Sequence, residues 1–245
     1  SELKKEGFTP KELLEEGFSL KELVTVCTIA ELRKAGKEPK ELSRIGITVA
    51  QLREGGFTAQ QLRDTGFAVS DLRKGGFTAD VLRVNGFGAR ELIDGGYHLK
   101  QLRVAGYTAV AMRDAGFGVA DLRTSGYTLY ELKSVPFTTK DLNEGGFTCG
   151  ELRVAGVPAS ELISLGVSVA DLKKAGFDVA ALKAAGCTVE QLKEGGLKLR
   201  QLKQLFSITE LLEATYTTAQ MRSVGYTPAE LRDAGKALAQ RVRSR

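Results

Sequence analysis

The chain has 245 residues, of which 42% are hydrophobic and 27% are charged, so its composition is that of a folded protein with an apolar core and not of a disordered one. Its formal charge is +5, and the last ten residues hold Lys236, Arg241, Arg243 and Arg245 without an acid, which leaves a nearly neutral body and argues against a dedicated polyanion-binding protein. The sequence has three widely spaced cysteines, no apolar run of membrane-spanning length and no recognisable signal peptide, so we expect reduced cysteines, no membrane association and, by default, a cytoplasmic location.

The sequence repeats with a period of ten residues from Phe8 to Gly235. Residues 57–66 read FTAQQLRDTG and residues 67–76 read FAVSDLRKGG. The shared pattern is an aromatic residue, threonine, an apolar residue, a variable residue, an acid or amide, leucine, a basic residue, two variable residues and glycine. We call each repeat a decad and number its positions 1 to 10.

The array contains 23 decads, with leucine at position 6 in 21 of them and glycine at position 10 in 19. Residues 18–26 and 197–205 form decads of only nine residues, which we expect to kink or retwist the array. Residues 1–7 match the second half of a further decad. A repeat this regular indicates one structural unit per decad.

Each decad predicts one short helix. Thr58 has the position and residue type of an N-cap, and Gln61 follows three residues later, which is the pattern of a capping box. The glycine at position 10 is expected to end the helix in the left-handed conformation, which leaves about six helical residues. Because the position 1 aromatic follows one helix and precedes the next, we expect Phe67 to contact both Leu62 and Leu72.

We therefore expect an all-α fold, an elongated α-solenoid of very short helices with one helix-turn per ten residues and about 23 units. Helices shorter than two turns are unstable alone, so each decad has to bury its apolar positions 1, 3 and 6 against other decads. Two decads per turn of the stack is the favoured arrangement and three is the alternative. The solenoid is expected to span residues 1–235 as a single domain, with residues 1–7 as a partial decad and residues 236–245 as a basic C-terminal cap or tail.

These GFTxxELRxxG-type decads resemble the short decapeptide repeats of helical repeat proteins from protists and giant viruses. The resemblance covers nearly the whole chain and implies a helical solenoid. It carries no catalytic residues and no substrate that would transfer to this sequence.

The candidate binding residues are the basic side chains at position 7, which is arginine or lysine in 16 of the 23 decads. On a regular solenoid they would form a ladder facing phosphates or an acidic segment. The structural alternative is that acids at position 5 and bases at position 7 complement the helix dipole. Tyr130 is a further candidate contact because position 4 is otherwise usually small or polar. The candidate ladder consists of Arg53, Arg63, Arg73, Arg83, Arg103, Arg113, Arg123, Lys173, Lys183, Lys193 and Lys203.

The leading hypothesis for function is a repeat scaffold that mediates protein–protein interaction or serves as a structural spacer. The alternatives are nucleic-acid binding through the basic ladder and end-to-end self-association. The only histidine, His98, has no partner at ligand or triad spacing and stands at an N-cap position, where we expect it to substitute for the usual cap. We expect no enzyme activity, no metal and no cofactor.

Overall fold

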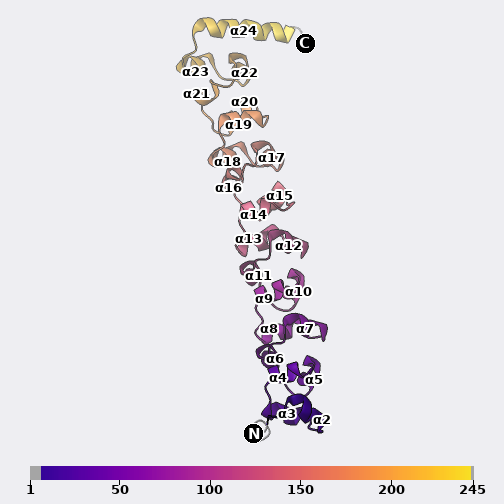
Figure 1. The fold of residues 1–245 in the computed structure, drawn as a ribbon. Helices are drawn as coiled ribbons and strands as arrows, with labels where there is room; N and C mark the ends of the chain where they lie inside the picture. The colour runs from indigo at the N-terminus through magenta and orange to yellow at the C-terminus, as the bar shows by residue number, and fades with distance from the viewer. Residues whose placement is uncertain (1–6, 244–245) are drawn as a thin grey trace. The chain divides into compact units, whose positions relative to one another are not determined.

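The computed structural model describes residues 7–243, with side chains up to residue 241. All regular secondary structure in this part of the chain is helical, and it forms 23 helices (Figure 1). The chain divides into two compact parts, one through Val135 and the other from Pro136 onward, which we call the N-terminal and the C-terminal array. The predicted all-α repeat fold is confirmed.

The N-terminal array contains α2 (Pro10–Glu15), α3 (Leu20–Val26), α4 (Ile29–Lys34), α5 (Pro39–Arg44), α6 (Val49–Glu54), α7 (Ala59–Asp64), α8 (Val69–Lys74), α9 (Ala79–Val84), α10 (Ala89–Asp94), α11 (Leu99–Val104), α12 (Ala109–Asp114), α13 (Val119–Thr124) and α14 (Leu129–Lys133). The C-terminal array contains α15 (Thr139–Glu144), α16 (Cys149–Val154), α17 (Ala159–Ser164), α18 (Val169–Lys174), α19 (Val179–Ala184), α20 (Val189–Glu194), α21 (Leu199–Leu202), α22 (Ile208–Glu213), α23 (Thr218–Ser223) and α24 (Pro228–Arg243).

Side chains within the decad set where each helix begins. At α7 the hydroxyl of Thr58 accepts from the backbone N–H of Gln61 at 3.2 Å, and the Gln61 side chain accepts from the backbone N–H of Thr58 at 2.9 Å. These two bonds satisfy donors that the first helical turn leaves free. His98 stands at the N-cap of α11, as expected, and its backbone N–H donates to the Gln101 side chain at 2.8 Å, but its imidazole makes no capping hydrogen bond.

The glycine at position 10 ends the helix. Gly66 has a φ of +89° and its N–H donates to the Arg63 carbonyl at 2.8 Å, while the N–H of Phe67 donates to the Leu62 carbonyl at 3.0 Å. This pair of bonds is a Schellman motif, and it leaves the six-residue helix body that the decad predicts.

The nine-residue decads end without a left-handed residue. The N–H of Cys27 donates to the carbonyl of Leu23, and that of Phe206 donates to Leu202, four residues back instead of five. The missing residue is therefore absorbed locally in the helix end, and the next decad begins in register.

Gly235 is an exception, and the prediction that it ends a helix is wrong. It lies inside α24, which continues through Pro228–Arg243 without a break. The physical reason is that the residues after it, from Lys236 to Gln240, favour helix and include no residue of N-cap type for a further helix. Of the predicted partial decad only Gly7 lies within the described residues, with a φ of +86°, and residues 244–245 of the predicted tail lie outside them.

The decads stack with two per turn. In the N-terminal array α4 contacts α6, α6 contacts α8 and α9 contacts α11, and in the C-terminal array α16 contacts α18 and α17 contacts α19. The leucines at position 6 form the core and are almost completely buried. The hydroxyl of Tyr107 also donates to the Phe87 carbonyl, two decads back, at 2.6 Å, and burial raises the pKa of Tyr107 to about 12. The favoured two-decad turn is confirmed.

Residues at positions 3 and 9 fit each other in size between stacked helices. A Cβ placed on Gly75 would lie 2.4 Å from Cγ1 of Val49, which is 26 residues earlier. Where position 3 is smaller, as at Ala79, position 9 two decads later carries a side chain, here Ala105. The same close approach joins Ile29 to Gly55, Val69 to Gly95 and Val169 to Gly195.

Candidate functional site

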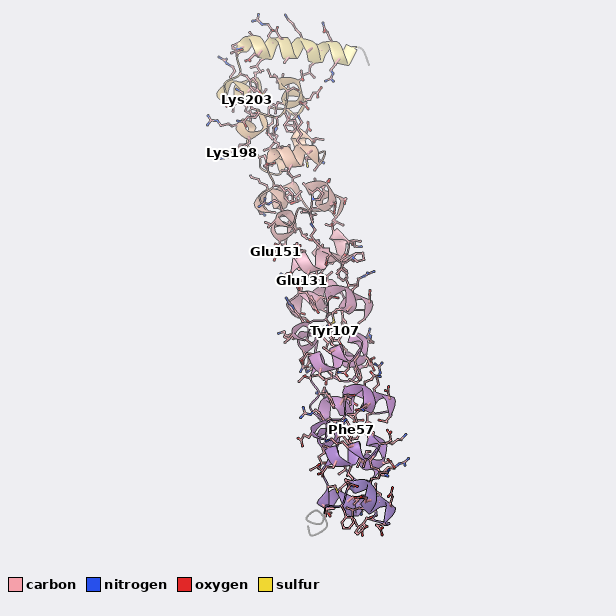
Figure 2. All side chains as sticks on the ribbon, in the orientation of Figure 1. Phe57, Tyr107, Glu131, Glu151, Lys198 and Lys203 are labelled. Atoms are coloured by element: carbon pink, nitrogen blue, oxygen red, sulfur yellow. The ribbon has the colours of Figure 1, made fainter. Side chains whose placement is uncertain are left out.

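The basic side chains at position 7 reach the C-terminal end of the helix two decads further on. Arg83 donates through Nε to the Ala105 carbonyl at 2.6 Å, and Lys203, labelled in Figure 2, donates through Nζ to the Val224 carbonyl at 2.9 Å. These carbonyls belong to the negative end of the helix dipole and have no partner within the helix. The same contact is made by Arg33, Arg53, Arg73, Arg153, Lys173, Lys183 and Lys193.

Several of these cations also lie over an aromatic ring. The Arg63 guanidinium is 4.6 Å from the centre of the Phe87 ring, and its Nη2 is 3.1 Å from a carboxylate oxygen of Glu91. Arg103 lies 5.0 Å from the centre of the Tyr127 ring and pairs with a position 5 carboxylate at 3.4 Å. Cation–π contacts of this kind add to the attraction between stacked decads.

The remaining candidates from the sequence are Arg113 and Arg123, which also stand at position 7, and Tyr130. Arg113 is 3.9 Å from the carboxylate of Asp114, and Arg123 lies in the last turn of α13. Tyr130 lies on α14 with 88% of its surface exposed. The structure thus gives many of the basic residues an intramolecular acceptor, and nucleic-acid binding by the ladder stays a prediction.

A groove recurs between helices that are two decads apart, and it is seen at four places in the described part of the chain. One wall comes from positions 1 to 4 of a decad, and the other from positions 1, 5, 8 and 9 of the decad two further on. The largest of these four grooves, between α9 and α11, has a volume of about 740 Å³, while the other three measure about 270 to 370 Å³. Residues lining the largest groove include Phe77, Ala79, Asp80, Tyr97, Lys100 and Val104.

The grooves share a framework and differ in chemistry. Positions 1, 3, 6, 7 and 10 are occupied by residues that the helix ends, the core or the stacking require. Position 8 has no such task, and in the four grooves it is Asp64, Val104, Glu194 and Glu213. One repeated surface therefore presents acidic chemistry in some places and apolar chemistry in another.

The groove between α20 and α22 is acidic. Glu190, Glu210 and Glu213 line it, and hydrogen bonds from the Ser207 hydroxyl and backbone hold the pKa of Glu210 below its usual value. Arg241 of α24 lies with its guanidinium 3.8 Å from the Glu213 carboxylate. Glu213, at the edge of this groove, therefore already lies close to a basic side chain from another helix.

Sequence reasoning missed position 8 as a site of interest. Val84 and Val104 are exposed over 77% and 90% of their surfaces, and Val154 is exposed over 79%. The signal was present, because position 8 is polar in all other decads except one with alanine. Among residues 7–243, no cluster of three or more histidines, cysteines, aspartates or glutamates is placed to hold a metal ion. No helix described for this chain combines the length and apolar character needed to cross a bilayer.

A family model described as "Decapeptide repeat region" matches the chain in four overlapping segments, residues 1–67, 36–109, 106–179 and 166–238. Together these segments extend from residue 1 to residue 238, so the match covers nearly the entire sequence. No curated protein matches the chain.

Proposed function

The chain belongs to the decapeptide repeat family, and on that basis we propose that this repeat scaffold is not an enzyme and binds protein partners in the grooves between its stacked helices. The observation that carries the proposal is that the positions free to vary, above all position 8, line one recurring groove. A repeat that conserves its framework and varies its groove walls suits recognition of extended partners along a stack.

A protein partner is favoured over a nucleic acid by charge. The body of the chain is nearly neutral, and many position 7 cations donate to backbone carbonyls at helix ends, so part of their hydrogen-bonding capacity already serves the stack. One wall also offers an exposed apolar side chain, Val104, which a protein partner could cover and a phosphate backbone would not need. Tyr130, exposed at position 4, adds a candidate aromatic contact.

The test is capture of proteins by the full chain, with one substitution in each of three grooves: Asp64→Lys, Val104→Asp and Glu213→Lys. Lys236→Glu on α24 is the control because it changes a charge outside the grooves. We expect at least one groove variant to lose a specific bound protein that the control retains. Melting temperatures equal to that of the unaltered chain would show that folding is intact.

Labelled single- and double-stranded oligonucleotides provide the competing test, measured by fluorescence anisotropy at low and physiological salt. Binding that survives physiological salt and weakens in Arg53→Gln and Arg73→Gln would replace the proposal with nucleic-acid binding. A chain that captures no protein and binds no oligonucleotide would instead be a spacer.

A further inference from the structure

We infer that the groove between α9 and α11 is a self-association site, at which two copies of this chain pair around a two-fold axis. The inference rests on the proposed function, because it takes one of the recurring grooves as a protein-binding site and names its partner. It is carried by an apolar pair and a charged pair that occupy equivalent positions on the two helices.

The apolar pair is formed by Val84 and Val104, which both stand at position 8 and are exposed over 77% and 90% of their surfaces. Their helices contact each other, so the two valines lie on neighbouring layers of the same edge. Val81, also on α9, has 39% of its surface exposed. These exposed valines stand at positions where the repeat otherwise usually carries polar residues, so an apolar surface interrupts a polar one beside the groove.

The charged pair is formed by Asp80 and Lys100, which both stand at position 4, are both exposed and both line the groove. Each precedes its valine by four residues, and residues four apart share one face of a helix. The face of α9 therefore presents an acid and a valine, while the face of α11 presents a base and a valine.

A two-fold axis that runs across the stack between α9 and α11 places α9 of one copy opposite α11 of the other. Asp80 then faces the second copy's lysine at position 100, and Val84 faces its valine at position 104, and both contacts occur twice by symmetry. One rotation matches opposite charges and apolar side chains together. A second copy of the chain is thus the occupant that these four residues, three of which line the groove, complement.

The area involved is modest compared with the roughly 800 Å² per partner of a standard interface. We therefore expect a weak dimer, detectable by its concentration dependence. Charge complementarity of this kind contributes chiefly to specificity and register.

The experiment is sedimentation velocity of the full chain over a wide concentration range, with charge-reversal variants. Asp80→Lys and Lys100→Asp should each be monomeric where the unaltered chain is dimeric, because like charges would meet twice. An equimolar mixture of the two variants should recover the dimer, because their charges are again opposite. Val104→Asp should also abolish pairing, and Val154→Asp, at the same repeat position in the other array, should leave it unchanged.

The inference would be overturned by an unaltered chain that is monomeric throughout, by single variants that dimerise like it, or by a mixture that fails to pair. Growth beyond a dimer with rising concentration would also overturn it, in favour of end-to-end association. Equal melting temperatures of all variants verify that folding is intact. None of these results decides the proposed function, which Asp64→Lys and Glu213→Lys test in grooves that the dimer does not use.

Discussion

Val49 and Gly75 lie in contact across the stack, with the valine on α6 occupying the space that a side chain at position 75 would need. Gly75 has a φ of −75°, which any residue can adopt, so only this contact excludes a side chain. The same valine or isoleucine with glycine, 26 residues apart, recurs in both arrays. Size matching between positions 3 and 9 therefore helps to hold helices two decads apart together where this pair occurs.

Gly75→Ala is expected to lower the free energy of unfolding by about 1 to 3 kcal/mol, because the new Cβ would meet Cγ1 of Val49 at 2.4 Å. Val49→Ala should relieve the overlap with Cγ1 and leave the approach of Cβ at 2.8 Å, so the double variant should be moderately more stable than the sum of the two single effects predicts. Urea titrations of the four proteins measure this coupling. Gly150→Ala is the control, because its nearest neighbour would be 3.9 Å away, and strictly additive effects at positions 49 and 75 would contradict the contact.

Arg83→Met is expected to lower stability by about 1 kcal/mol, since it keeps the aliphatic chain and removes the bond from Nε to the Ala105 carbonyl. Arg83→Lys should lose much less, because Lys203 makes the same kind of contact to the Val224 carbonyl. Thermal melts of the three proteins provide the comparison. Equal melting temperatures would mean that the cation at position 7 does not contribute to stacking.

Thr215→Gly is expected to raise stability by about 0.5 to 1 kcal/mol. Thr215 stands where most decads carry glycine and has a φ of +61°, a conformation that is strained for a β-branched side chain. Part of the gain is offset by the flexibility of glycine and by the lost contact with the Lys193 ammonium group. Thr218→Gly, at the first residue of α23, should destabilise the chain instead, and chemical denaturation of both variants checks the signs.

Glu131→Gln is expected to reduce the loss of stability in acid. Hydrogen bonds from the Thr128 hydroxyl and backbone N–H, with a smaller contribution from Arg103, hold the pKa of Glu131 below its usual value. A carboxyl whose pKa is lower in the folded state stabilises the fold at pH values above its usual range, and that contribution is lost as the pH falls through the folded-state pKa.

The amide preserves the cap, because Gln51 caps Thr48 in the same way. The unaltered chain should therefore have a higher melting temperature than Glu131→Gln at neutral pH. This difference in melting temperature should disappear as the pH falls below the range in which glutamate carboxyls titrate. Melts across this range measure the difference. A gap that stays constant with pH would show that the carboxylate charge is not involved.

The candidate surface was only partly accessible from the sequence. The period of ten located the basic side chains at position 7, but the acceptor of many of them is a backbone carbonyl, which every residue possesses and which leaves no trace in the sequence. The exposed valines at position 8 were visible as departures from a polar position. Their significance depends on α9 and α11 being neighbours, which the stacking determines.

The sequence by itself determined the helices, because the bonds that begin and end them close within about six residues, as between Thr58 and Gln61 or between Phe67 and Leu62. Those contacts depend only on local residue type. The tertiary structure decided which decads are in contact. Arg83 donates to a carbonyl 22 residues further along the chain, and Val49 contacts Gly75, which is 26 residues further along. The angle between successive helices determines after how many decads the chain comes back to the same side of the stack. That angle arises from the packing of many side chains at once, so the sequence favoured two decads per turn and the folded stack established it.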